Sequence, residues 1–116
     1  HEPVVCCVGD GGLGMTLAEL ETVARLDLDV TVVVFDDAAL SLIEIKQTAG
    51  QGAAGAVRYG AVDFAAVARG LGVPADVATS REELRAALAR RTRGPRLVDA
   101  RIDPGAYAAV LAATRG

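Results

Sequence analysis

The sequence predicts one α/β domain, a three-layer fold in which helices cover both faces of a parallel sheet. Short runs rich in valine alternate with segments of helical pattern, an order typical of layered parallel sheets. The chain has 116 residues, which suits one domain, and 52% of them are hydrophobic, so a core can form. A glycine-rich turn, Gly9–Gly14, directly follows the first Val-rich run, as at the ligand-binding edge of such sheets.

The N-terminal third has the pattern of a strand, a helix and a second strand. Pro3–Val8 is expected to be a buried strand that ends in the glycine-rich turn. Thr16–Glu19 has the pattern of a capping box, which predicts that a helix begins at Thr16 and ends at Asp27–Asp29. Val30–Phe35 is expected to be a second buried strand. Strands joined in this way are expected to be parallel neighbours.

The remaining segments continue the alternation of helices and strands. We expect a short helix over Leu40–Thr48, a mobile loop over Ala49–Gly60, a helix over Asp63–Leu71 and a short strand over Asp76–Ala78. These are followed by a helix with a capping box over Ser80–Arg90, a strand over Pro95–Ile102 and a final helix after the Asp103 cap. The loop holds four glycines and is either a lid over a site or a flexible connector.

Composition and charge exclude several function classes. The net charge is −3 and the pI is near 5.0, and the arginines between Arg81 and Arg96 are expected on a solvated helix face and its following loop. No nucleic-acid partner is therefore predicted. No apolar run approaches the roughly 20 residues of a membrane span, so no membrane-spanning helix is predicted. Cys6 and Cys7 are expected to be buried, reduced thiols, which fits a cytoplasmic protein, and the terminal His1 receives no role.

The glycine-rich turn fits two kinds of phosphate site. Gly9, Gly11 and Gly14 form a G-x-G-x-x-G pattern, which is typical of dinucleotide binding but weak on its own. Asp10 argues for the other kind. A carboxylate between two glycines would repel a pyrophosphate unless a divalent cation lay between them. The turn therefore favours a diphosphate cofactor that is bound through a metal ion.

Acidic residues end two strands that we expect to be neighbours. Asp10 follows the first strand, and Asp36 and Asp37 follow the second. Carboxyl ends of parallel strands meet at one edge, so these carboxylates could share one ion with a diphosphate, and Mg²⁺ takes about six such oxygen ligands. The helix expected at Thr16 would direct its N–H groups to the same place. The acids could instead end the strand or cap a helix, or one could hold a ribose hydroxyl.

At this point the sequence resembles the thiamine-diphosphate-dependent enzymes. Gly9–Gly11, followed by Asp36–Asp37 after a Val-rich strand, resembles their cofactor motif, which begins with GDG and ends in a pair such as Asn-Asn or Asn-Asp. Phe35–Gln47 and Pro95–Pro104 resemble the acetolactate synthase-like branch. The resemblance covers nearly the whole chain and implies a C-terminal cofactor-binding domain over residues 1–116, incomplete at its N-terminus, within a larger protein.

The resemblance implies a role for each position of the motif. It implies that Mg²⁺ is bound by the side chains of Asp10 and Asp37 and by the backbone carbonyl of Ala39. The cofactor-binding positions are Gly9, Asp10, Gly11, Gly12, Asp37, Ala39, Leu40 and Ser41. Leu42 and Ile43 would approach the thiazolium, where low polarity favours decarboxylation, or they are ordinary core residues.

Two departures from the family pattern limit what this chain is expected to do. Asp36 stands where Asn is usual, so its charge either weakens diphosphate binding or faces solvent. The resemblance also implies a separate pyrimidine-binding domain with an activating glutamate, and a homodimer or homotetramer that acts on a small 2-oxo acid. We therefore expect this chain alone not to catalyse decarboxylation or carboligation, and measurable pyruvate decarboxylation would refute that. A dinucleotide module and a degenerate packing domain remain as alternatives.

Overall fold

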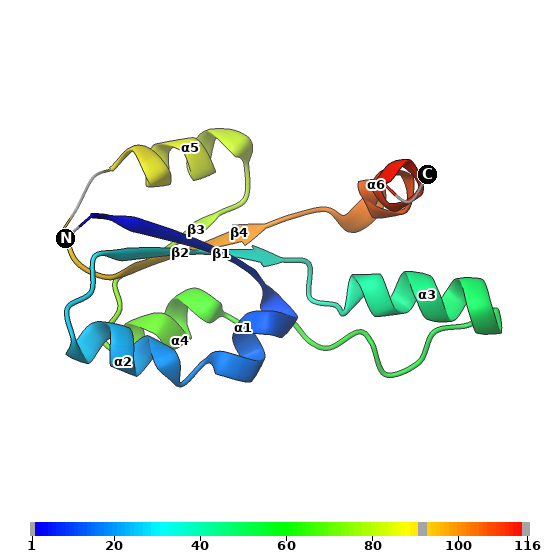
Figure 1. Cartoon of the computed structure of the whole chain (residues 1–116), viewed down its shortest axis with the longest axis horizontal. Coiled ribbons are helices and arrows are strands. Elements are labelled where there is room, and N and C mark those ends of the chain that lie inside the picture. Colours follow the sequence, from blue (N-terminus) through cyan, green and yellow to red (C-terminus); the bar gives the residue numbers. More distant parts are fainter. Residues whose placement is uncertain (1, 91–92, 115–116) are drawn as a thin grey trace.

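The computed structural model describes residues 2–90 and 93–114, and within them a four-stranded parallel sheet forms the centre of the molecule (Figure 1). The strands lie in the order β1-β2-β4-β3. Their bounds are Val4–Gly9 for β1, Val30–Asp36 for β2, Ala75–Ala78 for β3 and Arg96–Arg101 for β4. The predicted parallel pairing of the first two strands is confirmed, and β4 also pairs with β2 in parallel.

Helices cover both faces of this sheet, which confirms the predicted three-layer α/β fold. Figure 1 shows α1, α2 and α4 on one face and α5 on the other, while α3 and α6 lie beyond the carboxyl ends of the strands. The helices are α1 Asp10–Thr16, α2 Glu19–Arg25, α3 Ser41–Gln51, α4 Phe64–Gly70, α5 Arg81–Ala89 and α6 Tyr107–Thr114, with a 3₁₀ turn at Pro104–Ala106. None of the helices described in residues 2–90 and 93–114 has the length and apolarity needed to cross a membrane.

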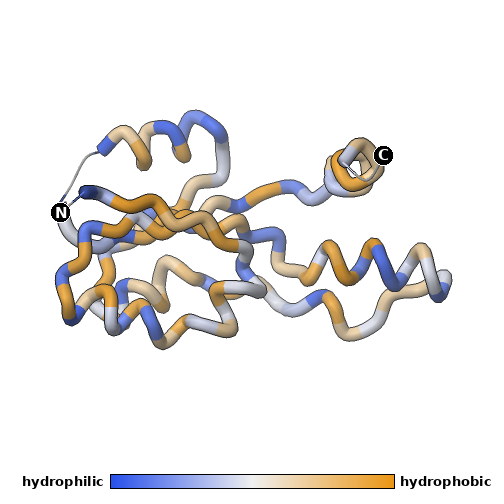
Figure 2. The backbone as a smooth tube through the Cα atoms, in the orientation of Figure 1, coloured by the Kyte–Doolittle hydropathy of each residue, from blue (hydrophilic) through white to orange (hydrophobic). Residues whose placement is uncertain are grey.

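The core has two parts, one on each face of the sheet, because successive strand residues point to opposite faces. The larger cluster joins Val32 and Val34 of β2 and Leu97 of β4 to buried residues of α1, α2 and α4. The smaller one packs Val98 of β4 against α5 and β3. Figure 2 shows hydrophobic residues along the strands at the centre of the molecule.

The prediction that the first strand is buried is wrong. β1 lies at the edge of the sheet, and its residues are exposed except for Val8, which packs against the larger core cluster. For the same reason Cys6 and Cys7 are exposed and free, not buried as expected. A Val-rich run therefore identified the strand correctly but did not reveal its position in the sheet.

The predicted start of the first helix is also wrong. The glycine-rich turn is itself helical, so α1 begins at Asp10 and ends at Thr16, whose hydroxyl donates to the Gly12 carbonyl at 3.3 Å. α2 then begins at Glu19 without a side-chain cap. The N–H groups that face the carboxyl edge of the sheet thus belong to a helix that opens at Asp10, and Thr16 lies at its far end.

The other predicted caps are confirmed. The side chains of Asp63, Ser80 and Asp103 each accept a hydrogen bond from a backbone N–H at the start of the following helix or turn, at 2.8, 3.1 and 2.9 Å. These residues satisfy N–H groups that have no partner inside the helix.

Two further expectations need correction. The loop predicted over Ala49–Gly60 is shorter, because α3 continues to Gln51, and Val57 within it is buried. Arg96 does not lie on a solvated face: it is 7% exposed, and its guanidinium donates to the carbonyls of Ala87 and Arg90. Arg91 of the predicted arginine cluster, like His1, lies outside the described residues.

Candidate functional site

A pocket of about 690 Å³ lies at the carboxyl ends of β1, β2 and β4. Its lining includes all ten positions that the sequence and the resemblance assigned to a cofactor, a metal or a thiazolium: Gly9, Asp10, Gly11, Gly12, Asp37, Ala39, Leu40, Ser41, Leu42 and Ile43. The structure therefore brings these positions together, although they come from two segments about 25 residues apart in the chain.

Six further residues that sequence reasoning missed also line the pocket. They are Met15, Phe35, Ile102, Tyr107, Val110 and Leu111. They belong to α1, the end of β2, the segment after β4, and α6. They are mostly apolar and follow no motif spacing, so the sequence carried no signal that separates them from core residues.

Asp10 is the buried acid at the start of α1. Its side chain is held at the turn because Oδ1 accepts a hydrogen bond from Gly11 N at 2.8 Å. The residue is 5% exposed, and Oδ2 is buried without a hydrogen-bond partner among the described residues. A buried carboxylate oxygen without a partner is costly, and a cation at this position would remove that cost.

Asp37 approaches the same pocket from the turn after β2. Its Oδ1 accepts from Ala39 N at 3.1 Å and its Oδ2 accepts from Ser41 Oγ at 2.7 Å. Burial raises the pKa of Tyr107, and the charges of Asp37 and Asp10 raise it further. Both carboxylates therefore act on one phenol hydroxyl, as expected if they face a common space.

The segment after α3 is attached to this turn by backbone hydrogen bonds. Leu40 N donates to the Val57 carbonyl at 2.7 Å, and Tyr59 N donates to the Ala38 carbonyl at 3.3 Å, around a bridge between Ala39 and Arg58. These bonds use neither hydrogen-bonding group of Ala39 itself. The predicted loop is therefore docked at its C-terminal end.

Tyr59 is a polar residue at this site that sequence reasoning did not identify. Its hydroxyl is buried and has no hydrogen-bond partner among the described residues. Burial, together with the neighbouring Asp10 carboxylate, raises the pKa of Tyr59 to about 12. The phenol is therefore protonated at neutral pH and offers a hydrogen-bond donor beside Asp10.

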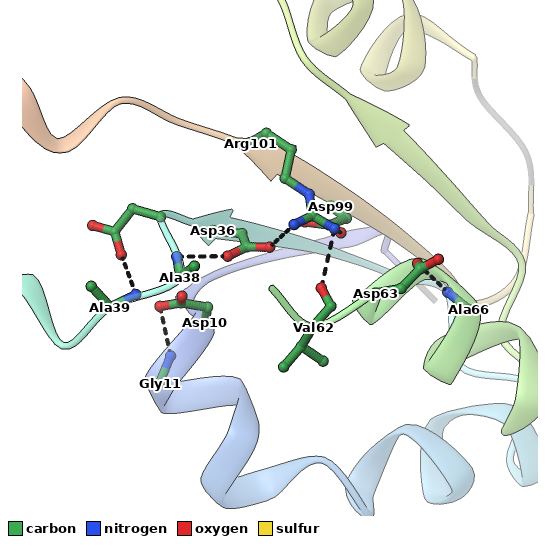
Figure 3. Close-up of polar contacts among 11 residues, drawn as sticks. Asp10, Gly11, Asp36, Ala38, Ala39, Val62, Asp63, Ala66, Asp99 and Arg101 are labelled. Carbon is green, nitrogen blue, oxygen red and sulfur yellow. Dashed lines mark hydrogen bonds and ion pairs between the residues drawn. The ribbon is translucent and has the colours of Figure 1, made fainter. Parts of the chain in front are cut away.

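Asp36 does not face solvent, which removes one of the two expectations for it. It is 2% exposed; Oδ1 accepts from Ala38 N at 3.0 Å, and Oδ2 lies 2.7 Å from Arg101 Nη1 (Figure 3). Burial raises the pKa of Asp36, and the neighbouring Asp10 raises it further. The Ala38 N–H and the Arg101 charge lower this pKa. The two adjacent aspartates thus have different surroundings.

The glycines of the turn separate the two phosphate-site hypotheses. A Cβ on Gly11 would lie 2.6 Å from Leu40 Cδ2, and one on Gly12 would lie 3.1 Å from Val8 Cγ2, so neighbouring side chains lie close to both glycines. A Cβ on Gly14 would meet nothing within 4 Å. In a dinucleotide fingerprint the third glycine allows close packing of helix on strand. Gly14 has no such role, which counts against that alternative.

Leu42 and Ile43 are not core residues. They lie in the first turn of α3, and 54% and 45% of their surface is exposed. Met15, which also lines the pocket, is 84% exposed. The pocket thus has an acidic end at Asp10 and Asp37 and an open, apolar remainder.

The protein side chains alone do not make a complete metal site. Among residues 2–90 and 93–114, no group of three or more His, Cys, Asp or Glu side chains is arranged to hold an ion. Two carboxylates and a carbonyl supply hard oxygen ligands, which suit Mg²⁺ when substrate phosphates and water complete its shell. The residues present therefore fit Mg²⁺ together with a diphosphate better than Mg²⁺ by itself.

Comparison with known proteins places most of the chain in one family. Residues 1–100 match the family described as thiamine pyrophosphate enzyme, C-terminal TPP binding domain. The chain is 36% identical over 110 residues to a putative acetolactate synthase large subunit IlvX of Mycobacterium tuberculosis, covering 84% of this chain and 21% of that protein. It is 31% identical over 104 residues to the acetolactate synthase isozyme 1 large subunit of Escherichia coli, covering 86% and 18%.

A solved structure shares the fold. The thiamine diphosphate-dependent 4-hydroxybenzoylformate decarboxylase of Rhodococcus jostii superposes with a TM-score of 0.76 at 20% identity, over 88% of this chain and 20% of that one. This chain thus spans about a fifth of the length of each of these proteins. Thiamine pyrophosphate is thiamine diphosphate, so the family match favours the diphosphate hypothesis over a dinucleotide module. The chain belongs to the family of C-terminal TPP-binding domains of thiamine pyrophosphate enzymes.

Proposed function

We propose that this chain binds the diphosphate of thiamine diphosphate through Mg²⁺ and forms the cofactor-binding part of an acetolactate synthase-like 2-oxo-acid decarboxylase or carboligase. The observation that carries the proposal is the buried Oδ2 of Asp10, which has no hydrogen-bond partner among the described residues and lines the same pocket as Asp37. A bound cation would compensate both carboxylates.

In this proposal the ion is held by the carboxylates of Asp10 and Asp37 and by the Ala39 carbonyl. The backbone at the glycine-rich turn and at Leu40–Ser41 would lie along the diphosphate, because these residues line the same pocket as the two acids. The cofactor, when bound, supplies the electron sink that makes decarboxylation of a 2-oxo acid possible. The chain's own residues bind it, orient it and provide an apolar surface beside it.

The apolar wall formed by Leu42 and Ile43 would face the thiazolium. Low polarity there favours loss of carbon dioxide, because the reacting group passes from a carboxylate to a nearly neutral species. We further propose that a pyrimidine-binding domain, in the same or a partner chain, supplies an activating glutamate. The complete enzyme would be a cytoplasmic homodimer or homotetramer.

A calorimetric titration with thiamine diphosphate tests the metal role. We expect binding in the presence of Mg²⁺ and its loss in EDTA. Asp10→Asn should weaken Mg²⁺-dependent binding at least ~10-fold, because an amide is a poorer ligand than a carboxylate and carries no charge. Asp76→Asn is the matched control, because Asp76 lies in β3, pairs with Arg90 and does not line the pocket. The affinity of this variant for thiamine diphosphate should equal that of the wild type.

The outcomes separate the three hypotheses. Binding of thiamine diphosphate that is unaffected by EDTA and by Asp10→Asn would reject the metal role. Metal-independent binding of NADH would support the dinucleotide module, and an intact protein that carries no cofactor after gentle purification would support a packing domain.

A further inference from the structure

Arg101 connects three separate segments beside the site. It is the last residue of β4, and its Nη1 lies 2.7 Å from Asp36 Oδ2 at the end of β2. Its Nη2 donates to Asp99 Oδ2 at 2.8 Å and to the Val62 carbonyl at 3.1 Å (Figure 3). One guanidinium thus joins two strands and the segment that precedes α4.

These contacts place one positive charge between two buried negative charges. The side chains of Asp36 and Asp99 are 1% and 0% exposed, and Arg101 is the one cation that forms an ion pair with either within the part of the chain that the structure describes. Loss of one partner from such a buried group leaves an uncompensated charge, which costs more than the pair gains. The buried charge of Asp36 is therefore compensated by Arg101.

Asp36 also determines the shape of the turn that carries the proposed metal ligands. With Oδ2 on Arg101, its Oδ1 accepts from Ala38 N, and Ala38 has a φ of 57°, a left-handed conformation that is unfavourable for a residue with a side chain. Asp37 and Ala39 follow in the same turn. A fixed Asp36 thus keeps Asp37 as the aspartate that lines the pocket.

We propose that Arg101 is a positioning residue that neutralises Asp36 and holds the turn from Asp36 to Ala39, so that Asp37 and the Ala39 carbonyl face the Mg²⁺ of the bound cofactor. This inference rests on the proposed function. Without Arg101, the Asp36 carboxylate adds negative charge close to Asp10 and opposes the diphosphate.

Charge rescue tests the proposal. Arg101→Met should weaken the binding of thiamine diphosphate in Mg²⁺ by ~10-fold or more, and Asp36→Asn alone should change it by less than about threefold. The double variant Asp36→Asn/Arg101→Met should bind within about threefold of Asp36→Asn, because the charge of Asp36 is gone while an amide oxygen still accepts from Ala38 N. Asp99 loses its partner equally in Arg101→Met and in the double variant, so a difference between these two variants reports on Asp36. The control is Arg96→Met, which removes another buried arginine of β4 whose partners are carbonyls; it should lower thermal stability and leave binding unchanged.

The second measurement needs no ligand. Amide hydrogen exchange at Ala38 and Ala39 should be ~10-fold faster in Arg101→Met and should return toward the wild-type rate in the double variant. The proposal is overturned if Arg101→Met binds normally, if the double variant binds as weakly as Arg101→Met, or if Arg96→Met weakens binding equally. If the complete wild-type protein binds no cofactor, the proposed function fails, and unchanged exchange in Arg101→Met would then overturn this inference separately.

Discussion

Gly11 is the residue of the glycine-rich turn at which an added side chain would require a neighbour to move. A Cβ there would lie 2.6 Å from Leu40 Cδ2, and Leu40 lines the pocket. Gly11→Ala must therefore displace the end of the Leu40 side chain, which lines the pocket. We expect it to destabilise the fold by about 1 kcal/mol and to weaken cofactor binding.

Gly14 provides the matched control in the same helix. A Cβ there meets nothing within 4 Å, so Gly14→Ala should stabilise the chain by about 0.5–1 kcal/mol by reducing the entropy of the unfolded state. Urea unfolding and calorimetry measure both effects. Equal changes in the two variants would show that packing at Gly11 is not special.

Asp99 gives the stability of the chain a pH dependence. Burial raises its pKa from 3.8 to about 6, and Arg101 opposes this increase. The folded chain therefore keeps a proton on Asp99 at pH values where the unfolded chain has lost it. This group's contribution is most favourable below pH 4, and stability falls as the pH rises from about 4 to about 6, by up to ~3 kcal/mol.

Asp99→Asn should remove the part of the stability loss between pH 4 and pH 6 that comes from Asp99. Urea unfolding at a series of pH values measures it as the difference between the wild-type and variant free energies of unfolding. If that difference is the same at pH 4 and pH 7, Asp99 titrates normally and the assigned cause is wrong.

At this scale the sequence predicted the motif residues and missed their partners. Asp10 and Asp37 follow from a pattern of glycines and acids at strand ends. The pairing of Asp36 with Arg101 depends on β4 lying beside β2, where the two residues are register partners. No pattern along the chain predicts the strand order, so the surroundings of Asp36 could not be predicted from the sequence.

Among the elements, the helix caps show where local patterns are reliable. Ser80 accepts from Glu83 N, and Glu83 in turn accepts from Thr79 N at 2.7 Å, a bond that helps to lower the pKa of Glu83. The same spacing at Thr16 has no such role, because the preceding glycines already form a helix that ends there. A capping-box pattern predicts the start of a helix only where no helix precedes it, and the helix that precedes Thr16 was not predicted from the sequence.

Two alanine substitutions test this difference. Ser80→Ala should destabilise the chain by about 1 kcal/mol, because it leaves the Glu83 N–H without its cap. Thr16→Ala should cost less than ~0.5 kcal/mol, because its hydroxyl only donates back to the Gly12 carbonyl. Thermal unfolding of both variants measures the costs, and a larger loss for Thr16→Ala would contradict the assigned helix boundaries.

The strands illustrate the limit of hydrophobic patterns. β1 and β2 are both Val-rich, yet β2 is central and β1 lies at the edge. A run of apolar residues predicts a strand because it suits a pleated sheet, but burial depends on what packs on each face. Exposed Cys6 and Cys7 are a direct consequence of this edge position.

At the scale of the whole molecule, the site is assembled from distant parts of the chain. The ends of β1 and β2 supply the acids, and α3 and α6 supply apolar walls beyond the sheet edge. The family of the chain, its layered fold and the position of the acidic edge were predictable, because a motif and an alternation of elements determine them. The walls from α6 were not, because their residues carry no motif.

The open apolar part of the pocket agrees with the proposed larger assembly. Met15, Leu42 and Val110 are exposed although they line the pocket. Exposed apolar clusters of this kind commonly mark binding surfaces. We propose that cofactor and a pyrimidine-binding domain cover them together in the complete enzyme.

The central claim is that one cation joins Asp10 and Asp37 to a diphosphate. Crystals of the chain grown with thiamine diphosphate and Mn²⁺ in place of Mg²⁺ test it directly, because anomalous scattering locates the ion. We predict one Mn²⁺ peak bound by both carboxylates, the Ala39 carbonyl and the diphosphate. Bound cofactor without an ion at these residues, or an ion held by Asp36 and Asp99 instead, would contradict it.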